Sequence, residues 1–236
     1  FQKIVLTMAL IFSTLNFYLL FNIFNRKILF KEHREDLYLF STVIVFILLI
    51  YFNNFKALDV IISVVSSLAN SGISLIESDN NLALYFLLIT IVGGSLISNT
   101  SGIKLSRFYI LLKITSAEIL KLISPNSVIN KTIFNSDKKI TDDNIKISFL
   151  IFISFFISLF ILSSFLVLDD IGFEKSFKLA ILTLTNTVNS EIYNLQNINF
   201  VNLLTSSKIS LIIFMIIGKI ELISIFLIFK NIFLRN

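Results

Sequence analysis

Cysteine and tryptophan are absent from this chain of 236 residues, and proline occurs once. Without cysteine, disulfide bonds and thiolate metal sites are excluded. The one histidine, His33, lies in a run of charged residues that we expect to be solvated, and no HExxH pattern is present. No constellation of catalytic side chains stands out either. We therefore expect neither a resident metal centre, nor a covalently bound cofactor, nor an enzyme.

Apolar residues are abundant instead. The chain is 56% hydrophobic, with a mean hydropathy of +0.88, which is typical of polytopic membrane proteins. Several apolar runs approach the roughly 20 residues that a helix needs to cross a bilayer. These runs predict about five spans, at Ile4 to Phe24, Leu37 to Phe52, Leu82 to Ile97, Ile145 to Leu168 and Ile209 to Phe233.

The first span could be a signal peptide, but no cleavage site of small residues follows it, so we interpret it as a retained helix. The chain opens with Phe1 and not with Met, so its first residues are expected to lie within a longer gene product.

Basic residues alternate along the chain and predict its topology. They are concentrated after the first span, at Arg26, Lys27, Lys31 and Arg34, and between the third and fourth, from Lys104 to Lys146. The positive-inside rule assigns these two loops to the cytoplasm, so Phe1 lies outside and Asn236 inside. The basic residues form no face interleaved with stacking aromatic residues, so we expect no nucleic-acid partner.

Two further segments are apolar but short and end in polar residues. They are FKALDVIISVVSSLANSGIS and GFEKSFKLAILTLTNTVNSE, and a shift of 116 residues superimposes them. The shift places Ser67 on Thr183, Leu68 on Leu184, Asn70 on Asn186 and Ser71 on Thr187. We interpret the pattern as two copies of a unit made of a helix, a short re-entrant helix, a polar turn and a second helix. The alternative is a pair of ordinary external loops rich in Asn and Thr.

Backbone inside the hydrocarbon must be helical unless it is buried in protein or lines a water-filled cavity. The carboxyl end of a short helix favours a cation, and carbonyl groups in the turn after it can replace a cation's hydration shell. Hydroxyl and amide side chains can hold such a turn by local hydrogen bonds, and Gly72 allows a positive φ. The two polar turns are therefore predicted to be ion filters.

The sequence resembles the Trk, Ktr and HKT superfamily of potassium and sodium uptake proteins, in which four such units surround one pore. ISVVSSLANSGIS is similar to a pore helix and filter ending TTTGF, and IVGGSLISNTSGIKLSR is similar to GGCAGSTAGGIKxxR. MIIGKIELISIFLIF is similar to MLLGRLExFTVLVLF, and SPNSVINKTIFNSDKKITDDNI resembles the linker between two units. The resemblance implies the carboxyl-terminal half of such a protein.

The fold class that follows is an all-α polytopic membrane protein with potassium-channel-like repeats, about five spans and two re-entrant pore helices. We predict that residues 1–35 end one unit, that 36–143 form a complete unit with its linker, and that 144–236 form another. By resemblance, the function is uptake of K⁺, or of Na⁺, through a filter-lined pore in a bacterial-type inner membrane. A homodimer and a cytoplasmic nucleotide-binding regulatory subunit are the implied partners, besides the lipid bilayer.

The resemblance also implies site residues. The filter comprises Ala69, Asn70, Ser71, Gly72, Thr185, Asn186, Thr187 and Val188. The stretch from Gly93 to Gly102 is expected to be an intramembrane gating loop, with Gly93, Gly94, Ser98 and Gly102 as its characteristic residues. Lys219 aligns with an arginine thought to project into the pore and is expected to be an inner electrostatic barrier; the alternatives are a structural ion pair, with Glu221 close in sequence, or a lysine extended to the interface.

Departures from the family pattern are concentrated at three positions. Val188 stands where a glycine is usual, and a β-branched residue strongly disfavours positive φ, so strict potassium selectivity is in doubt. Ile97 and Ser101 replace glycines of the gating loop and imply a stiffer gate. The alternative function is accordingly a non-conducting membrane scaffold that keeps the fold without transport. Two acidic pairs, Asp142 with Asp143 and Asp169 with Asp170, are expected to cap helices or lie in solvated loops; the second could instead attract cations.

Overall fold

The computed structural model describes residues 1–25, 33–52, 55–76, 80–124, 132–135, 139–169, 171–195, 198 and 200–219. Regular structure in these ranges is helical, with two isolated β-bridges as the β pairing. The all-α class predicted from the sequence is therefore confirmed. The α-helices are α1 (Gln2–Thr14), α2 (Phe17–Phe24), α3 (Arg34–Tyr51), α4 (Ala57–Leu68), α5 (Asn80–Ile91), α6 (Leu105–Ile123), α7 (Asp142–Val167), α8 (Phe173–Leu184) and α9 (Thr205–Lys219). Short 3-10 turns lie at Ile133–Asn135, Glu191–Tyr193 and Phe200–Asn202.

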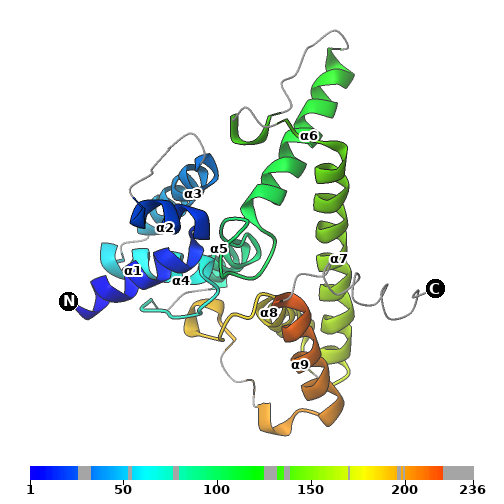
Figure 1. Cartoon of the computed structure of the whole chain (residues 1–236). Helices are drawn as coiled ribbons and strands as arrows, with labels where there is room; N and C mark the ends of the chain where they lie inside the picture. The colour runs from blue at the N-terminus through cyan, green and yellow to red at the C-terminus, as the bar shows by residue number, and fades with distance from the viewer. Residues whose placement is uncertain are drawn as a thin grey trace.

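The helices fall into two groups (Figure 1). Helix α4 packs against α1, α3 and α5 in the amino-terminal group, and α8 packs against α7 and α9 in the carboxyl-terminal group. Helices α6 and α7 contact each other and form the long side of the molecule in Figure 1, while α5 packs against α8 and joins the two groups. Each group therefore has one helix, α4 or α8, packed among the others.

Helices α4 and α8 are the most buried elements. All residues of α4 from Ile62 to Leu68 and of α8 from Leu179 to Leu184 are buried. Each helix has 12 residues, about 18 Å of helix, which is too short for a hydrocarbon core of about 30 Å. The two segments are thus half-length helices inside the protein, as the sequence indicated.

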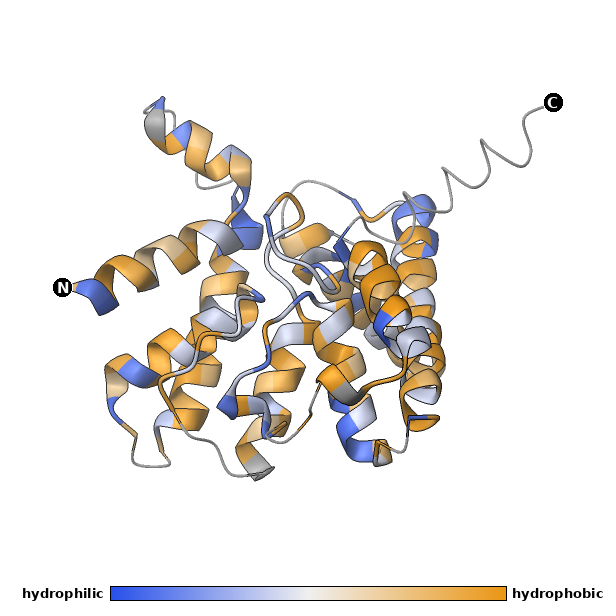
Figure 2. Ribbon diagram, turned by 90° about the horizontal axis from the view of Figure 1, so that it is seen from below, coloured by the Kyte–Doolittle hydropathy of each residue, from blue (hydrophilic) through white to orange (hydrophobic). Residues whose placement is uncertain are grey.

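Helix α7 lacks the polar exposed face of a helix in a soluble protein. Its buried face includes Ser148, Ser158 and Ser163, whereas its exposed face carries large apolar side chains such as Phe149 and Phe160. Each buried serine hydroxyl donates to a backbone carbonyl three or four residues earlier, so it needs no water. Apolar colour also dominates the helices in Figure 2. An exterior of this kind is suited to lipid.

Helix α7 has 26 residues and is, within the described ranges, the one continuous helix long and apolar enough to cross a membrane. The predicted span Ile4 to Phe24 is instead two helices, α1 and α2, bent by about 115°. The break has a local cause: Leu15 is extended, and the Asn16 side chain caps α2 by accepting from the Tyr18 amide at 2.9 Å. If the bent pair counts as one span, two helices meet the criterion.

One other predicted span is shorter than its apolar run, and another is described only in part. Helix α5 ends at Ile91, and residues 92–104 continue as a non-helical loop. Helix α9 is described to Lys219, so Glu221 and the rest of the run to Phe233 lie outside the described residues. The division into units at residues 35 and 143 stays a prediction.

Candidate functional site

The two re-entrant helices end in the same way. Adding 116 to the bounds of α4 gives the bounds of α8. The hydrogen bonds that follow each helix also agree at this offset. Asn70 N donates to Ser67 O at 3.2 Å, and Asn186 N donates to Thr183 O at 3.1 Å. The next amide donates five residues back, from Ser71 to Ser66 O at 3.0 Å and from Thr187 to Leu182 O at 2.9 Å.

This pair of bonds is a Schellman cap, in which one residue adopts the left-handed conformation. That residue is Asn70 in the cap of α4, with φ 56°, and Asn186 in the cap of α8, with φ 52°. Asparagine tolerates this conformation better than other residues with a side chain, because its short amide can hydrogen-bond locally. The sequence pattern placed Asn70 on Asn186, but the capping role was not predicted; two asparagines in register after matched apolar helices were its signal.

The hydroxyl groups near the second cap bond to nearby atoms, as expected for a turn of this composition. Thr183 Oγ1 donates to Leu179 O at 2.7 Å, and Thr185 Oγ1 donates to Ile181 O at 2.9 Å. The hydroxyls of Thr185 and Thr187 are 2.8 Å apart. All three threonines are buried, so the polar stretch after α8 is held by its own side chains.

The two predicted filter segments, residues 69–72 and 185–188, contact each other. A Cβ built on Gly72 would lie 2.1 Å from Val188 O, and the φ of Gly72 is +72°. The glycine at 72 is therefore required both by its conformation, as predicted, and by the close approach of the neighbouring backbone. Val188 is not among the residues with positive φ, and its side chain is 66% exposed. The backbone symmetry between the two segments is lost at this position.

Asn70 links the filter to the gating loop, residues 93–102. Its Nδ2 donates to Thr90 O at 3.0 Å and to Thr187 Oγ1 at 3.3 Å, and its Oδ1 accepts from Ser101 N at 3.1 Å. One buried side chain thus bonds to α5, to the second filter segment and to the gating loop. Sequence analysis considered its carbonyl and not this side chain.

Tyr193 is another residue that sequence analysis missed. Its side chain is fully buried, and its hydroxyl donates to Ser67 Oγ at 3.3 Å. The turn that contains it, Glu191–Tyr193, packs against α5. Tyr193 therefore connects the segment after the second filter to the pore helix before the first.

Backbone hydrogen bonds join the two ends of the predicted gating loop. Gly93 N donates to Ile103 O at 2.9 Å, and Ile103 N donates to Ile91 O at 2.8 Å. Gly102 has φ +77°, and a Cβ there would lie 2.8 Å from Ile91 O. The loop that the resemblance implied thus connects the end of α5 to the start of α6, and its two ends lie side by side.

The side chain of a buried lysine, Lys104, binds the backbone of this loop. Lys104 is 4% exposed, and its Nζ donates to Ser98 O at 3.1 Å and to Thr100 O. Thr100 Oγ1 accepts from Gly94 N at 2.8 Å. A Cβ on Gly94 would lie 2.6 Å from Thr14 O and 2.9 Å from Ser98 Oγ. The predicted loop residues Gly93, Gly94, Ser98 and Gly102 therefore all contribute to one compact structure.

Lys219 reaches the same loop from α9. Its Nζ donates to Asn99 O at 2.8 Å. Lys219 and Gly218 line a pocket of about 460 Å³ together with loop residues 96–102. Gly218 is also in close contact with the end of α8, since a Cβ there would lie 1.9 Å from Leu184 O. The structure thus brings the lysine and the gating loop together, while Glu221 lies outside the described residues.

Other residues named from the sequence have structural roles. Asp142 and Asp143 occupy the first turn of α7, which Thr141 caps by accepting from Asn144 N at 3.3 Å. Asp169 Oδ2 accepts from Leu204 N at 3.2 Å, while Asp170 lies outside the described residues. The expectation of a solvated His33 was wrong: its ring is 6% exposed and lies 3.0 Å from Asn22 Nδ2.

No family model and no curated protein sequence matches the chain. Among solved structures, the chain is similar to the crystal structure of the potassium transporter TrkH from Vibrio parahaemolyticus, with a TM-score of 0.83 at 16% sequence identity. The match covers 96% of this chain and 51% of TrkH, so the chain spans about half the length of that protein. The fold is therefore that of TrkH. Together with the apolar exterior of α7, it indicates an integral membrane protein.

Proposed function

We propose that the chain forms part of a pathway for uptake of monovalent cations, with potassium as the principal ion. The observation that carries the proposal is the matched pair of Schellman caps, which end two buried half-length helices at touching filter segments. Two ordinary external loops would have no physical reason to repeat the same hydrogen bonds at one offset. The fold shared with TrkH supports the same reading.

The caps determine which carbonyl groups serve a cation. Within each cap the carbonyls of residues 65–67 or 181–183 already accept from the following amides, so coordination falls to residues after them, including Ser71, Gly72, Thr187 and Val188. The negative ends of two helices add to the attraction for a cation. Because Val188 departs from the glycine geometry, the second segment coordinates less regularly, and we propose that Na⁺ also passes.

The gate in this proposal is the loop with its two lysines. Lys104 holds the loop from inside, and Lys219 places a second positive charge on its surface at Asn99. A cation leaving the filter meets this charge, which raises the barrier to passage while the loop is held. Movement of the loop away from Lys219 is the opening step that we propose.

The proposal needs more than this half. Two filter segments enclose only part of an ion path, so further segments must come from the same gene product or from a second copy. We propose an inner membrane location with Asn236 in the cytoplasm, supported by the positive charges of the loops. A homodimer and a cytoplasmic nucleotide-binding regulatory subunit are the partners that we propose to test for.

Rubidium uptake by cells that lack their own potassium uptake systems tests the function. The full-length protein should restore uptake, and Gly72→Val should abolish it, since a side chain there meets the Val188 carbonyl. Gly172→Val is the matched control, because a Cβ at Gly172 meets nothing within 4 Å. Membrane-inserted protein without uptake would instead support the non-conducting scaffold, which the exposed Val188 favours.

Selectivity tests the assignment of the filter. Val188→Gly should raise the preference for potassium over sodium, because glycine can adopt the positive φ that Gly72 has. An unchanged permeability ratio would contradict the assignment of residues 185–188 as a filter.

A further inference from the structure

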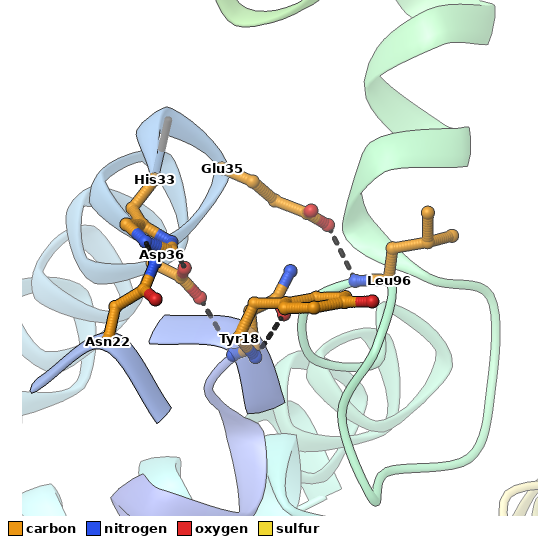
Figure 3. Close-up of polar contacts among 7 residues, drawn as sticks. Tyr18, Asn22, His33, Glu35, Asp36 and Leu96 are labelled. Atoms are coloured by element: carbon orange, nitrogen blue, oxygen red, sulfur yellow. Dashed lines mark hydrogen bonds and ion pairs between the residues drawn. The ribbon is translucent and has the colours of Figure 1, made fainter. Parts of the chain in front are cut away.

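A cluster of polar side chains holds the gating loop from the start of α3 (Figure 3). Glu35 Oε1 accepts from the backbone amide of Leu96 at 2.7 Å. The neighbouring Asp36 Oδ1 accepts from Asn16 N at 3.0 Å, at the break between α1 and α2. Consecutive carboxyl groups on one helical turn thus bind the loop and the corner beside it.

The corner and the loop are also bonded to each other. Ser95 N donates to Thr14 O at 3.0 Å, and Phe17 N donates to Ile97 O at 2.9 Å. Asn99 N donates to Ser13 O at 3.2 Å. The limb of the loop from 95 to 99 therefore lies between the α1–α2 corner and Glu35. This limb is the part of the loop that Lys219 contacts from the other side.

We propose that Glu35 is a positioning residue for the gating loop: its carboxyl group holds the Leu96 limb against the α1–α2 corner, and release of this contact accompanies opening. The inference rests on the proposed function, and it places a titratable group on the gate at the side assigned to the cytoplasm. Sequence analysis treated Glu35 as one of a run of solvated charges.

The electrostatics of the cluster make the contact sensitive to pH. The pKa of Glu35 is raised to about 7: burial is the largest cause and the nearby Asp36 also raises it, while the Leu96 amide, the Ser106 side chain and Lys104 partly offset the rise. Burial also raises the pKa of Asp36, while the Asn16 amide and His33 lower it. When the loop releases and water reaches Glu35, its pKa falls toward the ordinary value of 4.5.

The direction of the pH effect follows from the difference in the pKa of Glu35 between the held and the released loop. The held loop is the state with the higher pKa, so protonation of Glu35 stabilises it, and deprotonation favours release. The ratio of released to held loops should therefore rise by up to about tenfold as the cytoplasmic pH increases from roughly 6 to 8. Flux should rise with it. The uncharged carboxylic acid still accepts from Leu96 N through its carbonyl oxygen, so the contact persists at low pH.

The test is rubidium flux in proteoliposomes containing the full-length protein, with the pH varied on the cytoplasmic side. Glu35→Gln keeps an acceptor for Leu96 N but cannot ionise, so its flux should stay near the low-pH level of the parent protein at every pH. Glu118→Gln is the matched control, since Glu118 is an exposed carboxylate on α6 paired with Lys121. It should keep the parent pH profile.

Either of two outcomes would overturn the inference: Glu35→Gln with the parent pH profile, or a parent protein whose flux does not change across this range. Absence of flux from the parent protein at every pH would instead refute the proposed function. Glu35→Ala adds an independent check that does not depend on pH. Loss of the acceptor should increase protease cleavage or hydrogen exchange in residues 95–99, and an unchanged loop would also contradict the inference.

Discussion

The two cap asparagines provide an internal comparison that isolates the coupling between filter and gate. Asn70 and Asn186 have nearly the same φ, so replacing either with alanine imposes a similar backbone penalty, because alanine tolerates the left-handed conformation less well than asparagine. Their side chains differ. Asn186 Nδ2 donates to Met215 O at 2.8 Å, whereas Asn70 makes three bonds within the buried core.

Removing the Asn70 side chain leaves the Ser101 amide buried and unsatisfied, which costs about 1–3 kcal/mol. Asn70→Ala should therefore destabilise the protein by about 1–3 kcal/mol more than Asn186→Ala, since the backbone penalty is common to both variants. Unfolding in mixed micelles measures both variants. Equal losses would refute the reasoning, because the cost would then be backbone strain alone. Asn70→Asp keeps the acceptor for Ser101 N and should recover part of the difference.

Two other predictions concern contacts at the ends of the filter segments. Gly218→Ala should lower the stability of the protein by about 1–3 kcal/mol through overpacking against Leu184 O, and it should reduce uptake. Gly172→Ala, at an open position, should leave uptake unchanged. Equal loss of uptake in both variants would contradict the contact between Gly218 and Leu184. Tyr193→Phe should lower stability by about 0.5–1.5 kcal/mol, because Ser67 loses a buried partner, and a variant as stable as the parent in the same unfolding assay would show that the hydroxyl contributes nothing.

Much of the fold could be predicted from the sequence, because the lengths of the apolar segments and their repetition can be read directly along the chain. The short apolar segments at 57–68 and 173–184, their polar ends and the offset of 116 residues predicted the two re-entrant helices. Gly72 was identified for the reason that the structure confirms, a positive φ. The loop after Ile91 was implied by resemblance and coincides with the end of α5.

The contacts that were missed join residues distant in sequence. Nothing in the pattern around Asn70 indicates that its amide reaches Ser101, 31 residues on, or Thr187, 117 residues on. The bend after α1 was missed because the run from Ile4 to Phe24 is uniformly apolar except at a few polar positions, of which Asn16 is the helix cap. His33 was predicted to be solvated because charged sequence predicts exposure on average; here Asn22 of α2 provides a partner that allows its burial.

The repeat extends beyond the two caps, to the helix that follows each of them. Each cap asparagine donates to a carbonyl of the following helix, Thr90 O or Met215 O, and each carbonyl lies three residues before a glycine, Gly93 or Gly218. This second correspondence has an offset of 125 rather than 116, because the segment after the second filter is longer. At the next position the units differ: Gly94 lies in the non-helical loop after α5, whereas Lys219 is a residue of α9 and binds that loop at Asn99. The position that is Gly94 in the loop after α5 is thus Lys219 in α9, and this lysine donates to the loop of the other unit at Asn99 O.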